Sequence, residues 1–160
     1  MKRFGLTFGV VLSVLTTLAM ANPVAAGEQV PFKGGFEGDV TATPLTPPFR
    51  QVDIDAAGQA THLGQFTVDI PHVANRANGT AVGSYEFTAA NGDKVYAEFT
   101  GQAQPTATSG VLYIVETATI TGGTGRFAGA SGSFRVERFY DTVAGTTVGS
   151  FEGTISSPGR

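Results

Sequence analysis

The sequence predicts an all-β domain in which eight antiparallel strands close into a single barrel. Glycine, threonine, valine and phenylalanine are abundant while leucine, lysine and glutamate are sparse, a balance that disfavours helices. Apolar and polar residues alternate with a period of two beyond residue 26, as half-buried strands require. Glycines inside the predicted strands suit a sheet that coils sharply, and closure removes exposed sheet edges. A two-layer sandwich is the alternative architecture.

The first 26 residues are typical of a secretory signal peptide. Residues 1–3 supply positive charge, and residues 4–18 form an apolar run without charge. Cleavage is expected after Ala21 or Ala26, which leaves residues 27–160 as the barrel domain. The run is short for a membrane anchor, so the mature protein is expected to be secreted or periplasmic, with no membrane contact after cleavage.

The charge balance excludes some classes of partner. Removing Lys2 and Arg3 from the 10 basic residues leaves eight against 13 acidic residues, a net charge of −5. Binding of nucleic acid requires clustered positive charge, so no nucleic-acid partner is expected. The chain has no cysteine and therefore neither disulfides nor thiolate metal sites.

The first strands follow from alternation and from proline. Residues 32–43 place apolar and small side chains on one face, and the proline-rich segment 44–48 ends the strand because proline cannot donate to a ladder. A second strand is expected at residues 49–55, followed by a bend or bulge at 57–58. The third is expected to run without interruption over residues 61–72.

The clearest hairpin lies in the middle of the chain. Residues 82–89 and 94–101 flank Asn91-Gly92, a dipeptide that accepts the positive φ angles of a type I′ turn. The three remaining strands are expected at residues 111–121, 132–141 and 146–156.

A glycine-rich turn joins two of these strands and carries a family resemblance. Residues 120–125, Ile-Thr-Gly-Gly-Thr-Gly, followed by Phe127, Gly129 and Gly132, resemble the strand-turn-strand of allene oxide cyclases. A similar segment occurs in plant dirigent proteins, and with residues 60–64 and the Asn91-Gly92 hairpin the chain looks like exported bacterial proteins grouped as allene-oxide-cyclase-barrel-like.

The resemblance implies a calycin-like barrel that forms a homodimer or homotrimer and acts on a hydrophobic small molecule held in its cavity. It gives the turn residues an architectural role and no catalytic one. The turn residues concerned are Gly122, Gly123, Gly125, Phe127, Gly129 and Gly132. Arg126, within this turn, is expected to brace the carbonyl groups of the turn or to clamp a carboxylate. The catalytic polar groups of the cyclases have no match in this chain.

Three polar residues are candidates for chemistry. Glu116 shares a face with Leu112 and Ile114, so on an internal face it would need a partner such as Arg138 on the next strand. The opposite register exposes Glu116 to water. His62 is a candidate acid-base group at the barrel mouth, or a histidine that ties its ring to the backbone.

A joint metal site of the two histidines is not expected. His62 and His72 would stand about 30 Å apart on a straight strand. No metal site is therefore predicted, and no cofactor is expected either.

The inward faces predict a lumen and three functions for it. The exported barrel binds a small hydrophobic molecule, is a cofactor-free cyclase or isomerase, or is a structural protein whose core is filled by phenylalanine. Residues expected to contact a ligand are Tyr85, Phe87, Phe99, Ile114 and Phe134, and the same aromatic residues would form the core of a filled barrel. Lumen volume separates the structural alternative from the others, and a polar cluster deep in an open lumen would favour an enzyme.

Overall fold

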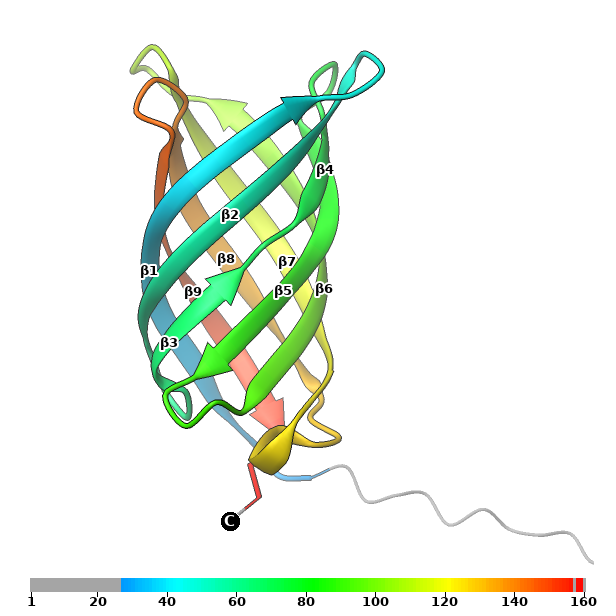
Figure 1. The fold of residues 1–160 in the computed structure, drawn as a ribbon, viewed down its shortest axis with the longest axis vertical. Coiled ribbons are helices and arrows are strands. Elements are labelled where there is room, and N and C mark those ends of the chain that lie inside the picture. Colours follow the sequence, from blue (N-terminus) through cyan, green and yellow to red (C-terminus); the bar gives the residue numbers. More distant parts are fainter. Residues whose placement is uncertain (1–26, 157, 160) are drawn as a thin grey trace, which may run out of the picture.

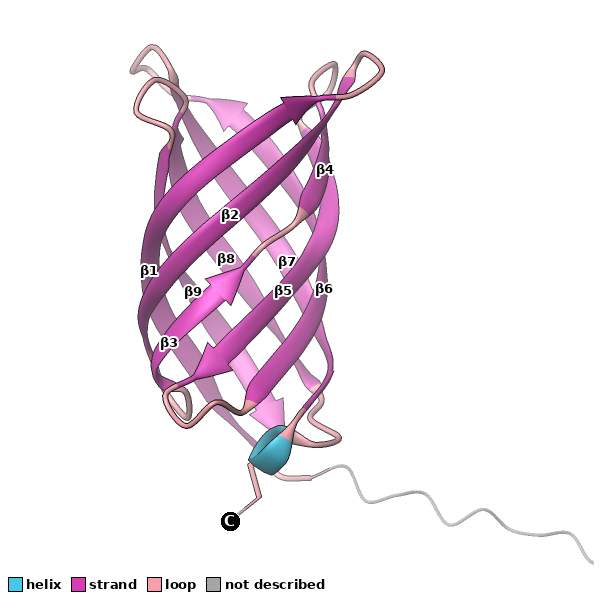
Figure 2. Ribbon diagram, in the orientation of Figure 1, coloured by secondary structure: helices cyan, strands magenta, loops and turns pink. Residues whose placement is uncertain are grey.

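Nine strands form one closed antiparallel barrel in the computed structural model, which describes residues 27–156, 158 and 159 (Figure 1). The predicted signal peptide lies outside the described residues. The strands are β1 (Gln29–Pro44), β2 (Phe49–Ala60), β3 (Gly64–Asp69), β4 (His72–Asn75), β5 (Thr80–Ala89), β6 (Lys94–Pro105), β7 (Val111–Gly123), β8 (Gly132–Asp141) and β9 (Thr146–Ser156). One turn of 3-10 helix, η1 (Gly125–Phe127), precedes β8 (Figure 2).

Closure comes from pairing of the first two strands. The sheet order is β1-β9-β8-β7-β6-β5-β3-β2, and β1 pairs antiparallel with β2 from Gly34 opposite Ala60 to Pro44 opposite Arg50. β3 and β4 both lie between β2 and β5, so together they occupy one position in the wall. The barrel therefore has eight positions, as predicted.

Because neighbouring positions in the wall run antiparallel, the loops between them alternate between the two ends of the barrel (Figure 1). We call the end with the 45–48, 76–79, 106–110 and 142–145 loops the upper end. The lower end carries the turns after β2 and β5 and the glycine-rich turn before β8. None of the helical structure in residues 27–156 has the length and apolar character of a membrane-spanning helix.

Two sequence-based expectations about the strands are wrong. The expected single strand 61–72 divides into β3 and β4, because Pro71 has no N–H for the ladder. Its carbonyl instead accepts from the Ser84 amide at 3.1 Å. The expected bend at residues 57–58 is absent, and β2 continues to Ala60. Gly58 lets β2 pack closely against β1 at this point, since a Cβ on residue 58 would lie 1.9 Å from the Gly35 carbonyl oxygen.

The lower half of the barrel is filled by aromatic side chains. Phe32, Phe87, Phe134 and Phe151 contact one another with ring centroids 4.9–5.9 Å apart, in edge-to-face and tilted arrangements. Tyr85 stacks on Phe87 at 5.5 Å and lies above it along β5. This cluster forms a packed floor across the barrel.

The glycine-rich turn covers the lower end. Phe127, in η1, is 1% exposed and packs into the core from below. The Arg126 guanidinium donates to the His62 carbonyl, and the Arg126 amide donates to the Asp93 carboxylate at 3.1 Å. Arg126 thus braces a carbonyl of the turn after β2, whereas the expectation was a carbonyl of its own glycine-rich turn.

Candidate functional site

An open cavity of about 690 Å³ occupies the upper half of the barrel. The cavity exists because the inward positions on the upper parts of β4, β5 and β6 carry alanine and glycine. The corresponding positions in the lower half carry larger side chains such as phenylalanine. Residues from every strand except β3 and β9 line it. They are Val40, Arg50, Val52, His72, Ala74, Asn75, Arg76, Ala77, Asn78, Gly79, Ala81, Gln102, Ala103, Pro105, Leu112, Ile114, Arg138, Tyr140 and Thr142.

A buried ion pair lies at the floor of this cavity. Glu116 is 0% exposed and Arg138 is 2% exposed. Arg138 Nη2 donates to Glu116 Oε1 at 2.8 Å, and Nε donates to both carboxylate oxygens at 3.2 and 3.3 Å. Of the two registers left open by the sequence, the structure has the one that places Glu116 inside and beside Arg138.

Two hydroxyl groups complete the cluster. The Tyr85 hydroxyl donates to Glu116 Oε2, and Thr147 lies 3.4 Å from Arg138 Nη1. Burial, followed by the negative charge of Glu116, raises the pKa of Tyr85 well above its ordinary value of 10.0. The phenol therefore stays protonated and remains a donor to Glu116. Each buried charge has partners, as a stable buried pair requires.

His72 supplies an acceptor at the same depth. It is 6% exposed and lines the cavity, and its Nδ1 lies 3.0 Å from the Ile70 carbonyl oxygen. A carbonyl can only accept, so Nδ1 carries the proton. Burial lowers the pKa of His72 below 6.5, against the opposing effect of this hydrogen bond. The ring is therefore neutral at pH 7. Its Nε2 has no hydrogen-bond partner among the described residues and is free to accept.

The structure separates the residues that the sequence singled out. Glu116 and Arg138 meet at the cavity floor, and Ile114 lines the cavity. His62 is not part of this site: it lies in the turn after β2 at the lower end. Its backbone has φ of 63°, and its carbonyl, rather than its ring, is hydrogen bonded. The four remaining residues expected to contact a ligand pack with one another below the cavity. They are Tyr85, Phe87, Phe99 and Phe134.

Sequence reasoning missed four of the polar residues that face the cavity or its floor. They are Arg50, His72, Arg76 and Thr147. Alternation along the strands could have placed two of them on the inward face. Arg50 has the same parity as the inward Val52 and Ile54 on β2, and His72 continues the inward series of Phe66 and Val68. No group of three histidine, aspartate or glutamate side chains gathers as a metal site in residues 27–156.

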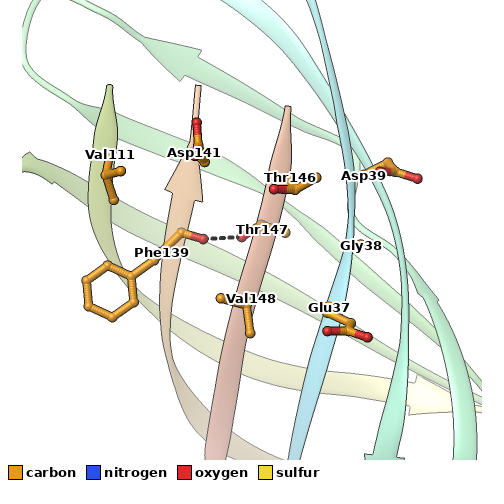
Figure 3. Close-up of a pocket in the computed structure, with 9 residues that line it drawn as sticks. All are labelled: Glu37, Gly38, Asp39, Val111, Phe139, Asp141, Thr146, Thr147 and Val148. Atoms are coloured by element: carbon orange, nitrogen blue, oxygen red, sulfur yellow. Dashed lines mark hydrogen bonds between the residues drawn. The ribbon is translucent and has the colours of Figure 1, made fainter. Parts of the chain in front are cut away.

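A second hollow, of about 440 Å³, lies on the outer wall over β1, β8 and β9 (Figure 3). Phe139 and Val148 are exposed on this wall at 50% and 55%, and they pair across β8 and β9. The charged residues around it are acidic, namely Glu37, Asp39 and Asp141. The outer hollow thus has the opposite charge to the cavity inside the barrel.

Comparisons with known proteins support the fold. No family model matches the chain, and no curated protein matches its sequence. Among solved structures, a pterocarpan synthase dirigent protein matches with a TM-score of 0.58 over 91% of this chain and 98% of that chain, at 11% sequence identity. At this identity the match shows a shared barrel fold of the dirigent type and no more.

Proposed function

We propose that this barrel binds one small, largely apolar molecule in its upper cavity. The proposal rests on a single observation: the barrel is packed below and open above, with about 690 Å³ left unfilled. Cavities of roughly 300–1,000 Å³ with apolar walls and a few polar groups are typical of small-molecule sites. A purely structural barrel would gain stability by filling this space.

The polar floor would orient the bound molecule. Arg138 offers donors and His72 Nε2 offers an acceptor, and both residues line the cavity. The structural neighbour is a pterocarpan synthase by name. Its shared fold supports the idea that such a barrel can hold a small organic molecule.

Binding is tested with N-phenyl-1-naphthylamine, a neutral apolar dye whose fluorescence rises in apolar sites. We expect saturable binding to the described domain at one site. Ala103→Phe, which fills the cavity, should abolish it, whereas Ala57→Phe on the outer wall should leave it unchanged. Absence of saturable binding, or equal binding by the Ala103 variant, would overturn the proposal.

A second candidate function is that of a cofactor-free isomerase or cyclase, and the depth of the polar cluster favours it. His72, in place of His62, would act as the base through its free Nε2, and Arg138 would stabilise negative charge on the substrate. A suitable probe is 5-nitrobenzisoxazole, which a base opens by removing one carbon-bound proton as the N–O bond breaks. We expect accelerated opening by the wild-type protein and loss of that acceleration in His72→Phe. Equal rates in both would overturn the enzymatic candidate.

A further inference from the structure

The lining of the upper cavity contains three arginines and the neutral His72, but no acidic residue. The arginines are Arg50, Arg76 and Arg138. The chain as a whole has 13 acidic and 10 basic residues, so this bias opposes the overall composition. Positive groups inside low-dielectric walls focus the potential at the mouth of a cleft.

Two of these cations have no counter-charge. Arg138 is neutralised by Glu116, but no carboxylate of residues 27–156 lies within ion-pair distance of Arg50 or Arg76. Arg50 lies at the upper start of β2 and is half-buried, and Arg76 lies in the upper loop that follows β4. The rim therefore offers two cationic groups to a ligand.

The two arginines are also close to each other. Arg50 on β2 lies opposite Ala74 on β4, and the Arg76 amide donates to the Pro48 carbonyl at 3.0 Å. This continued pairing makes the backbones of Arg50 and Arg76 diagonal neighbours at the upper end. Two neighbouring cations without a counter-charge repel each other, and an anion bound between them would offset that repulsion.

Below the two arginines the walls are apolar. The aliphatic lining residues are Val40, Val52, Ala74, Ala81, Leu112 and Ile114. A ligand that satisfies both zones has an apolar body for the walls and a negative group for the rim.

We infer that the ligand is an amphipathic organic anion, with its acidic headgroup paired to Arg50 and Arg76 and its apolar body inside the cavity. This inference rests on the proposed binding function and names the chemical class of the ligand. The acidic hollow on the outer wall cannot serve the same anion, because its charged residues are Glu37, Asp39 and Asp141.

Two dyes that share one scaffold test the inference. 1-Anilinonaphthalene-8-sulfonate is N-phenyl-1-naphthylamine with a sulfonate added, so the pair isolates the effect of the negative charge. We expect the sulfonate to bind the wild-type domain about tenfold more tightly at low salt, and salt should weaken only the sulfonate.

The matching variants locate the charge effect. Arg50→Gln with Arg76→Gln should lower the sulfonate affinity about tenfold and leave the neutral dye unchanged. Lys33→Gln with Arg135→Gln removes two exposed cations from the outer wall and should alter neither affinity.

The outcomes separate the two claims. If the neutral dye binds but the sulfonate binds no more tightly, or if the rim variant keeps full sulfonate affinity, the inference is wrong and the proposed function stands. If neither dye saturates the wild-type domain, the proposed function is wrong and the inference falls with it.

Discussion

Glu116 is stable inside the barrel because its carboxylate accepts several hydrogen bonds. Arg138 supplies two nitrogen donors and Tyr85 supplies a hydroxyl, and all three groups are almost completely buried. Removing both ions from water costs several kilocalories per mole, which the pair recovers only through this geometry. Gly101 leaves the necessary space, since a Cβ there would lie 2.8 Å from Glu116 Cγ.

Glu116→Gln is therefore expected to destabilise the domain by about 3 kcal/mol or more, because it leaves the Arg138 charge buried without a counter-charge. Urea unfolding followed by tyrosine fluorescence measures the loss. The double variant Glu116→Leu with Arg138→Met should recover most of it, since both charges are then absent. A single variant within about 0.5 kcal/mol of the wild type would contradict this account.

His72 predicts a pH dependence of stability. Its pKa in the folded protein is lowered from 6.5 by burial, so the unfolded chain binds a proton first as pH falls. Stability contributed by neutral His72 is fully present above pH 6.5 and is lost as pH falls toward the folded pKa. The charged groups that act on the ring are Arg138, Glu116 and Asp53.

The measurement compares His72→Phe with the wild type by unfolding between pH 7 and pH 5. We expect the wild type to lose more stability than the variant over this range. His62→Asn is the control, because His62 lies in a left-handed turn that asparagine tolerates. Equal pH profiles for wild type and His72→Phe would contradict the expected burial effect.

At the level of strands, alternation predicted most of the inward faces and therefore the barrel. It failed where a single backbone feature decides the outcome: Pro71 divides the third strand, and Gly58 lets β2 run straight where a bend was expected. On β7 both faces are apolar, so the pattern alone does not decide the side of Glu116. Pairing with Arg138, on the next strand, resolves it.

The candidate site was less predictable than the fold. Arg50 and Arg76 are far apart in sequence and meet only because β4 pairs with β2. From the sequence, His72 is considered only for a metal site shared with His62, although it lies on the inward face of its strand, where the structure buries it beside the cavity. The depth of the cavity depends on how far the phenylalanines fill the barrel, which alternation does not specify.

The glycine-rich turn allows a matched pair of substitutions. Gly125 has φ of 54°, and a Cβ there would lie 1.9 Å from Asp93 Oδ1. Gly129 has φ of 72°, and a Cβ there would have no neighbouring atom within 4 Å. Gly129→Ala should cost about 1 kcal/mol through backbone strain alone, and Gly125→Ala should cost more because it also displaces the Asp93 carboxylate. Equal losses in thermal or urea unfolding would contradict this difference.

Considered as a whole, the barrel separates stability from binding along its length. The lower half holds the aromatic core and the glycine-rich turn, and the upper half holds the cavity with its arginine rim. Substitutions in the two halves should therefore affect different measurements. The ion pair of Glu116 and Arg138 lies at the boundary and belongs to both halves.

The packed aromatic side chains close the lower half of the barrel, so the cavity above them accepts a bound chain only up to a limiting length. For straight-chain alcohols of increasing size, each added methylene should tighten binding about fourfold while the tail still advances toward the floor. Once the tail reaches the floor, where Arg138 and His72 lie, further carbons must remain in water and the affinity should stop rising. Displacement of a fluorescent dye by the alcohol series would locate this limit, and the barrel would then select ligands by chain length.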